Sequence, residues 1–154
     1  MSKKELINLL NHGLELEHAA YVQYLSHAEI VVGLVSDPII ARLKEIADDE
    51  KEHQKKFRTL IGDFLDSVPS MGMTKPHSVV VSKDSTKVIK EILRINLKNE
   101  REAIDFYRRI YELVTKMKAE LKYEFSTMEH EIRHIIIDEE EHAVELRRLL
   151  EEQG

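Results

Sequence analysis

Apolar residues recur every three or four positions along four long segments of the chain, which is the period of an amphipathic α-helix. The first two segments span about residues 3–35 and 37–68, and the second begins at Asp37-Pro38, a favourable N-cap followed by a first-turn proline. The third opens near Asp84-Ser85. The fourth follows a turn somewhere within residues 116–125, where neither proline nor glycine marks the position. The pattern therefore predicts four long helices.

Helix-breaking residues are concentrated between the second and third segments. The chain has only five glycines and three prolines, and two of the prolines lie within residues 67–76. Residues 69–84 also carry a β-branched run and predict a long non-helical crossover. Two helical hairpins joined by such a crossover form an all-α, antiparallel four-helix bundle with a long connection between helices 2 and 3. A chain of 154 residues fits one domain, 1–154.

Six ionisable residues interrupt the apolar stripes near the middle of the predicted helices. Each stripe carries one glutamate, and two carry a histidine one turn later. The six are Glu17, Glu50, His53, Glu100, Glu139 and His142. Burying a lone carboxylate costs several kcal/mol, four together repel one another, and no lysine or arginine lies near them on the inner stripes. Two divalent cations would balance the four negative charges, so the pattern predicts a dinuclear metal site.

Helix phase separates these residues from similar pairs elsewhere. Four Glu-x-x-His pairs occur in the chain, and at ~100° per residue only those at 50–53 and 139–142 lie within the apolar stripes. The pairs at 15–18 and 131–134 are predicted to be solvated. Three further glutamates are predicted to face outward: Glu52, Glu102 and Glu141.

The spacing and ligand types indicate which metal suits the site. One glutamate from each of two helices, with Glu-x-x-His from the other two, is the general pattern of di-iron and di-manganese carboxylate bundles. Mostly oxygen ligands with one imidazole per ion suit iron or manganese better than zinc. The alternative is a metal-free scaffold in which the buried groups form salt bridges and hydrogen bonds.

The two halves of the chain resemble each other around this site. Residues 49–53 match residues 138–142 in type and spacing, and a tyrosine follows a glutamate by seven residues in both remaining helices, at Tyr24 and Tyr107. The halves therefore form an internal pseudo-repeat.

Composition excludes several classes of protein. A net charge of −6 argues against a nucleic-acid binder. The absence of cysteine excludes disulfides, Cys-ligated zinc and iron–sulfur clusters. The longest apolar run, residues 30–35, is far shorter than the ~20 residues of a membrane helix, and the N-terminus has no signal-peptide pattern. We expect a cytosolic protein with no membrane partner.

The chain resembles the bacterioferritin and rubrerythrin branch of the ferritin-like superfamily over nearly its whole length. Residues 17–28 are similar to the first helix of bacterioferritins, and residues 91–100 to the third. The Glu-x-x-His pairs at 50–53 and 139–142 are similar to the second and fourth helices. The resemblance implies a ferritin-like bundle that binds two iron ions, with manganese as the alternative.

The resemblance also implies roles for individual residues. It implies that Glu50 and Glu139 bridge the two ions. The terminal ligands it implies are Glu17 and His53 for one ion, and Glu100 and His142 for the other. Asp49 and Asp138 would orient the histidines, or remain exposed helix charges. Tyr24 and Tyr107 would donate an electron or hydrogen-bond a ligand, or serve only in core packing.

Three departures from the family pattern restrict the function. Lys51 and Glu52 stand where bacterioferritins have a haem-ligating methionine, so we expect no haem. Ala103 stands where rubrerythrins usually carry another glutamate. Only 12 residues follow His142, too few for the fifth helix of 24-subunit cages, which argues against cage assembly.

The leading hypothesis is a ferroxidase-type oxidoreductase that oxidises Fe(II) with O2 or H2O2. The alternatives are a peroxide-removing enzyme, rubrerythrin-like or manganese-catalase-like, and a non-enzymatic subunit of an iron-storage cage. Expected partners are Fe(II), the oxidant, an external electron donor whose identity the pattern leaves open, and at least one further copy of the chain, since related bundles pair along their first two helices.

Overall fold

Four long helices make up most of the molecule. The computed structural model describes residues 2–31 and 37–154, and all regular secondary structure within them is helical. The long helices are α1 (Ser2–Ile30), α2 (Asp37–Thr59), α3 (Ser85–Lys116) and α5 (Phe125–Glu152). Two short elements accompany them, the π-helix η1 (Leu60–Phe64) and α4 (Lys118–Leu121). None of the described helices is both long enough and apolar enough to cross a membrane.

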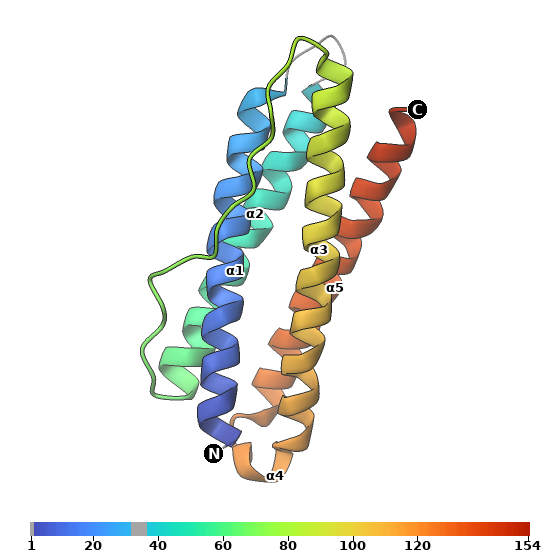
Figure 1. Cartoon of the computed structure of the whole chain (residues 1–154). Helices are drawn as coiled ribbons and strands as arrows, with labels where there is room; N and C mark the ends of the chain where they lie inside the picture. The colour runs from blue at the N-terminus through green and yellow to red at the C-terminus, as the bar shows by residue number, and fades with distance from the viewer. Residues whose placement is uncertain (1, 32–36) are drawn as a thin grey trace.

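The helices form two hairpins that pack side by side. α1 packs along α2, α3 packs along α5, and α1 and α3 bring the hairpins together. A long non-helical crossover lies along the outside of the first hairpin and returns the chain to the end of the bundle at which α3 begins (Figure 1). The predicted fold class, an antiparallel four-helix bundle with a long crossover between its second and third helices, is confirmed.

One predicted helix end differs from the structure. α1 is described to Ile30, and its predicted end near Val35 lies outside the described residues. The second helix continues only to Phe64, not Val68, and its last turn is a π-helix. Asp66, with φ 50°, reverses the chain there, and the Ser67 amide donates to the Ile61 carbonyl at 2.9 Å. A left-handed residue and this backward hydrogen bond are common helix stops that hydrophobic periodicity does not reveal.

The remaining predicted boundaries agree with the structure. α3 begins where expected, because the Asp84 side chain caps it by accepting a hydrogen bond from the Lys87 amide at 3.1 Å. The turn between the third and fourth long helices lies within residues 116–125 and contains the single helical turn α4. Lys122, with φ 34°, follows α4 and redirects the chain into α5.

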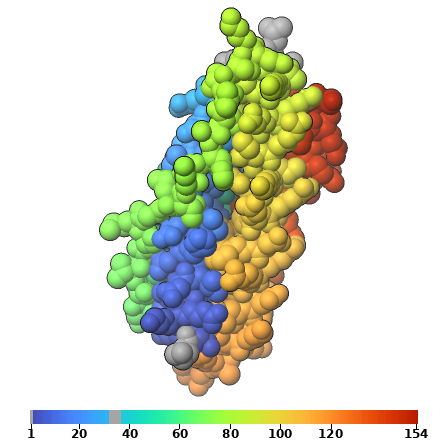
Figure 2. All heavy atoms as spheres, viewed as in Figure 1, coloured from blue at the N-terminus to red at the C-terminus, as the bar shows by residue number. Residues whose placement is uncertain are grey.

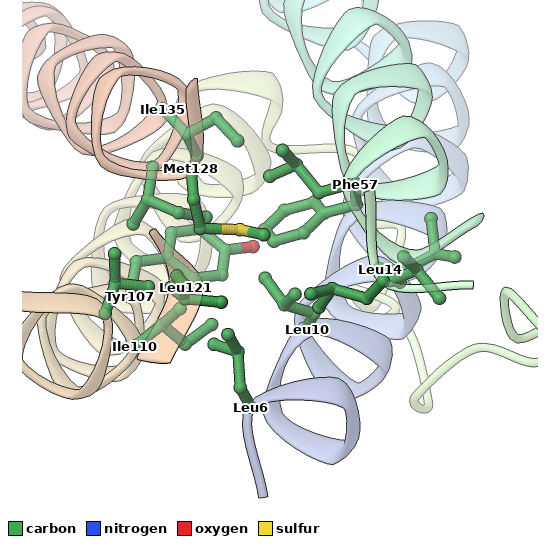
Figure 3. Close-up of a cluster of buried hydrophobic side chains, with 14 of the residues drawn as sticks. Leu6, Leu10, Leu14, Phe57, Tyr107, Ile110, Leu121, Met128 and Ile135 are labelled. Atoms are coloured by element: carbon green, nitrogen blue, oxygen red, sulfur yellow. The ribbon is translucent and has the colours of Figure 1, made fainter. Parts of the chain in front are cut away.

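The apolar core is divided into two clusters at opposite ends of the bundle. One cluster gathers leucines and isoleucines around Phe57 and Tyr107 (Figure 3). The other surrounds Tyr24 with residues such as Leu43 and Ile92. Each fully buried aliphatic side chain stabilises the fold by about 1.5–3 kcal/mol. The clusters leave a layer between them in which the buried residues are charged rather than apolar.

Candidate metal centre

The six predicted ligands converge in this polar layer. Their ligand atoms form two groups, and within each group these atoms all lie within 4.8 Å of one another. The first group contains Glu17, Glu50, His53 and Glu139. The second contains Glu50, Glu100, Glu139 and His142. Glu50 and Glu139 belong to both groups and therefore lie where the two groups meet.

Each long helix contributes to this constellation from its inward face. α1 and α3 give one glutamate each, whereas α2 and α5 each give a glutamate and the histidine one turn later. The (i, i+3) spacing places that glutamate and histidine on one helix face. All six side chains are at most 3% exposed, so the bundle screens them from bulk water.

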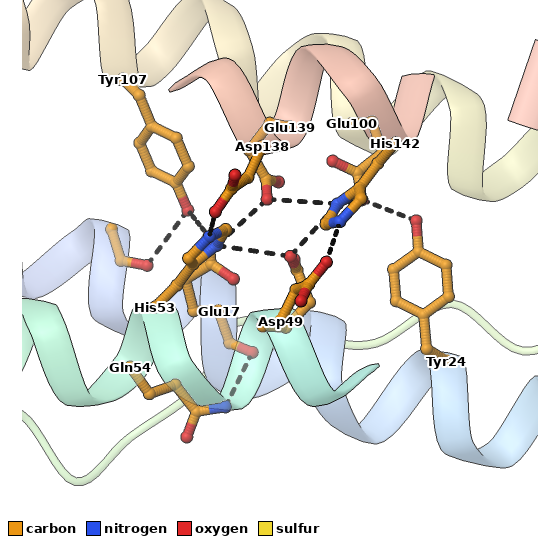
Figure 4. A network of polar contacts seen from close by, with 12 residues as sticks. Glu17, Tyr24, Asp49, His53, Gln54, Glu100, Tyr107, Asp138, Glu139 and His142 are labelled. Carbon is orange, nitrogen blue, oxygen red and sulfur yellow. Dashed lines mark hydrogen bonds and ion pairs between the residues drawn. The ribbon is translucent and has the colours of Figure 1, made fainter. Parts of the chain in front are cut away.

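The two histidines are oriented by acids from the opposite hairpin. Nε2 of His53 on α2 lies 2.8 Å from Oδ2 of Asp138 on α5, and Nε2 of His142 on α5 lies 2.8 Å from Oδ2 of Asp49 on α2 (Figure 4). These contacts turn both Nδ1 atoms toward the glutamates. A carboxylate at the far nitrogen of a ligating histidine fixes its tautomer and makes it a better ligand.

Two tyrosines complete the inner layer. The Tyr24 hydroxyl donates to Oε1 of Glu100 at 2.6 Å, and the Tyr107 hydroxyl donates to Oε1 of Glu17 at 2.7 Å. The two contacts follow the internal pseudo-repeat, since Tyr24 on α1 bonds the glutamate of α3 and Tyr107 on α3 bonds the glutamate of α1. Each holds one carboxylate oxygen and leaves the other free.

The protonation of the layer reflects its crowded charges. Burial, with the negative charge of Glu139, raises the pKa values of both Glu50 and Glu100 well above the usual range. Burial opposes the charge on His53, yet the charge of Glu17 and the hydrogen bond to Asp138 outweigh it and raise the His53 pKa. Glu139 is also buried, yet the imidazoles of His142 and His53, whose Nδ1 atoms lie 3.5 and 3.2 Å from its Oε1, hold its pKa well below the usual range. Without a metal ion, protons must therefore supply positive charge.

One atom on each of the six residues is buried without a hydrogen-bond partner among the described residues. The atoms are Glu17 Oε2, Glu50 Oε1, His53 Nδ1, Glu100 Oε2, Glu139 Oε1 and His142 Nδ1. An unpartnered buried polar atom costs about 1–3 kcal/mol. Six such atoms facing one another, four of them carboxylate oxygens, are the donor set of a pair of divalent ions. The residues present therefore fit a dinuclear metal centre.

A cavity of about 270 Å³ reaches this layer between α1 and α3. Its inner wall includes the four glutamates and both tyrosines, and its outer wall includes Thr74, Lys75 and His77 of the crossover. Figure 2 shows this face, with the crossover beside α1 and α3. The space is large enough for small molecules such as O2 or H2O2, but the crossover forms part of its wall.

The amino-acid sequence matches a known family model over residues 7–154, the ferritin-like domain. The chain belongs to the ferritin-like domain family. This confirms the resemblance to the ferritin-like superfamily. A search of the curated proteins finds no match to the chain.

Solved structures with the same fold support the assignment of this chain to the ferritin-like domain family. It is 25% identical to a ferritin-like diiron-carboxylate protein from Bacillus anthracis, with TM-score 0.75 over 97% of this chain and 98% of the other. It is also 25% identical to a dodecameric thioferritin, a bacterioferritin-related protein, from Bacteroides fragilis, with TM-score 0.79 over 97% and 86% of the two chains. Desulfovibrio desulfuricans bacterioferritin, 21% identical, shares the fold with TM-score 0.76 over 97% and 80%.

The residues predicted to lie outside the centre of this ferritin-like protein do so. Glu52, Glu102 and Glu141 are exposed. The members of the pairs at 15–18 and 131–134 are half-buried on helix flanks, so they are less solvated than helix phase alone predicts. Their partners explain the difference: Ser70 donates to Glu15, and Lys56 pairs with Glu131.

A second buried polar network was not predicted from the sequence. Gln23 and His27 on α1 and Asn96 on α3 bond to one another and to the backbone of His77, and so attach the crossover to the bundle. The available signal was the polar pair at positions 23 and 27, one turn apart beside the inner stripe of α1. Its role depends on the position of the crossover, which hydrophobic periodicity does not predict.

Proposed function

We propose that this chain is a ferroxidase-type di-iron oxidoreductase that binds two Fe(II) ions and oxidises both with O2 or H2O2. The observation that carries the proposal is the set of six buried, unpartnered ligand atoms at the middle of the bundle. Their number and type suit two iron ions better than one ion or a salt-bridge network. The likeness to a diiron-carboxylate protein supports iron in preference to manganese.

Each residue has a role that follows from its position. Glu50 and Glu139 belong to both ligand groups and would bridge the two ions. Glu17 with His53 and Glu100 with His142 would complete one ion each. Carboxylates suit this chemistry because they shift between one-oxygen and two-oxygen binding as the charge on iron changes.

The reaction balances with these components. Two Fe(II) ions give up one electron each, and the two electrons with two protons convert O2 to H2O2, or H2O2 to two waters. The cavity between α1 and α3 gives the oxidant a route to the layer. Tyr24 and Tyr107, each hydrogen-bonded to one of these glutamates, would hold those carboxylates in position.

An anaerobic Fe(II) titration of the metal-free protein, followed by air, tests the proposal. The expected result is saturation near two irons per chain and rapid oxidation followed by absorbance. Glu50→Ala and Glu139→Ala should abolish the coupled oxidation. Glu52→Ala and Glu141→Ala serve as matched controls, because these exposed glutamates lie two residues further along the same helices. Unchanged kinetics in the first two variants would overturn the assignment.

The choice of oxidant distinguishes the proposed oxidase from a peroxide-removing enzyme of the same site. Consumption of O2 and of H2O2 is compared for the iron-loaded and the manganese-loaded protein. Net Fe(II) oxidation by either oxidant supports the ferroxidase. Rapid H2O2 removal without net Fe(II) oxidation would instead assign peroxide removal.

We further propose that the chain forms a homo-oligomer of at least two copies. The support is the likeness to a ferritin-type protein described as dodecameric. Light scattering coupled to size-exclusion chromatography measures the state directly. A hollow assembly that retains many tens of irons per chain would make storage the leading function, whereas a dimer that retains about two would support catalysis without storage.

A further inference from the structure

The first half of α5 carries a second histidine pair that the dinuclear centre does not use. Residues 130–134 read His-Glu-Ile-Arg-His. This is the H-E-x-x-H spacing with which a helix presents two imidazoles, one turn apart, to a zinc ion. The stretch lies away from the buried layer, because His130 is exposed and His134 is half-buried.

The two imidazole rings are already close together. Their centroids are 4.1 Å apart and their planes differ by 34°. Among the residues that the structure describes, neither ring has a hydrogen-bond or ion-pair partner, in contrast to His53 and His142, whose Nε2 atoms are bonded to aspartates. Free nitrogens on adjacent turns of a helix form a chelating pair, and imidazole suits zinc, copper, nickel and iron.

The glutamate of the motif, Glu131, contacts a lysine and not the two histidines. Oε2 of Glu131 lies 3.4 Å from Nζ of Lys56 on α2, so the glutamate is held in an ion pair between helices. Among the described residues, no third histidine or carboxylate has a ligand atom close enough to join this pair. Catalytic zinc sites use three protein ligands and a bound water. The geometry therefore favours a two-histidine holding site completed by water, not a hydrolytic one.

The pair lies on the outer flank of α5, in the turns of the helix that precede Glu139. Asp138 follows His134 by one turn on the same flank of α5, and its carboxylate bonds to His53. Together with the contact between Glu131 and Lys56, this places the pair at the α2 side of α5. We propose that His130 and His134 form a separate surface site for a divalent transition-metal ion of the zinc class. The proposal does not depend on iron oxidation at the centre.

The number of Zn²⁺ ions bound per chain measures the number of sites directly. Metal-free protein is dialysed against Zn²⁺, and the bound metal per chain is measured for the wild type, His130→Ala, His134→Ala and the double variant. His12→Ala is the matched control, since it removes an exposed histidine from α1. Circular dichroism verifies that each variant is folded. The expected result is the loss of one Zn²⁺ per chain in all three motif variants and no loss in the control.

The possible outcomes separate this site from the dinuclear centre. Three Zn²⁺ in the wild type and two in the motif variants would support the surface site alongside an intact centre. One Zn²⁺ in the wild type and none in the motif variants would support the surface site and count against the proposed centre. Equal zinc content in the wild type, the motif variants and the control would overturn the surface site.

Discussion

The aspartates next to His53 and His142 show how single residues orient the side chains of the buried layer. Asp49 and Asp138 are exposed by 49% and 39%, which is why a sequence pattern leaves their role open. Only packing of α2 against α5 shows that each bonds to the histidine of the other helix. Each aspartate thus joins the two hairpins and orients a histidine of the buried layer.

Removing either aspartate should weaken metal binding without removing a ligand. We expect Asp49→Ala and Asp138→Ala to lower Fe(II) affinity about 10–100-fold, the usual effect of losing such a partner. Competition with a coloured chelator under anaerobic conditions measures the affinity. Asp48→Ala is the matched control, since the neighbouring Asp48 is exposed. An Asp49→Ala affinity equal to that of Asp48→Ala would show that the contact to His142 is incidental.

His27 is held neutral by its hydrogen bonds. The Asn96 side-chain amide donates to the Ile92 carbonyl at 2.9 Å, and its second hydrogen faces Nδ1 of His27, also at 2.9 Å. Nδ1 must therefore accept, which leaves Nε2 to donate to the His77 carbonyl at 2.7 Å. If Nδ1 of His27 were protonated, its N–H would face the N–H of the Asn96 amide, and the two donors would repel each other.

The pH dependence of stability should report this residue. Burial lowers the pKa of His27, so below about pH 6.5 the unfolded chain binds a proton that the folded chain does not. The free energy of unfolding therefore decreases as the pH falls through that range. His27→Gln keeps one donor and one acceptor but does not titrate. We expect its thermal midpoint to fall less than that of the wild type between pH 7 and pH 5, and parallel curves would contradict the assignment.

At the scale of the helices, close packing explains a glycine in the middle of α1. A Cβ added to Gly13 would lie 2.9 Å from Cζ of Phe57 and 3.3 Å from Cε1 of Tyr107. Glycine costs a helix about 1 kcal/mol relative to alanine. The cost is offset because the aromatic rings from α2 and α3 pack directly against the α1 backbone.

Gly13→Ala should destabilise the protein although alanine is the better helix former. Overpacking of a filled core costs about 1–3 kcal/mol, which exceeds or cancels the propensity gain. Thermal unfolding checks the prediction, and Gly62→Ala is the control, because its new Cβ would come no closer than 3.8 Å to Pro69. We expect a lower midpoint for Gly13→Ala only. A higher midpoint for both variants would show that Phe57 and Tyr107 move aside freely.

The helices themselves and their inward ionisable residues follow from periodicity, whereas other features do not. Glu17 and Glu100 stand on stripes of buried leucine and isoleucine, so their direction is fixed by helix phase. The end of the second helix depends on the left-handed conformation of Asp66, a local choice with no hydrophobic signature. Contacts to the crossover, such as that of His27, depend on where a segment without periodicity comes to lie.

At the scale of the whole molecule, the two apolar clusters stabilise a bundle whose middle layer opposes folding. The clusters lie on either side of the six predicted ligands, so the layer cannot separate without exposing the core. The bundle therefore keeps the carboxylates together even when no ion binds, with protons reducing their charge. Metal binding and proton binding must then compete at the same place.

This competition predicts how metal removal and pH act together. Binding of two divalent ions should raise the thermal midpoint. At a free metal concentration one hundred times the dissociation constant, each site adds about 2.7 kcal/mol to the free energy of unfolding, and a chelator should reverse the effect. Because the pKa values of Glu50, Glu100 and His53 are raised without metal, binding must displace their protons. The metal-induced rise should therefore shrink as the pH falls from 8 to 6, and loading should acidify a weakly buffered solution. Calorimetric scans with and without Mn(II) measure the first effect and a pH-stat the second. A rise that does not change with pH would mean that the layer binds its ions without releasing protons.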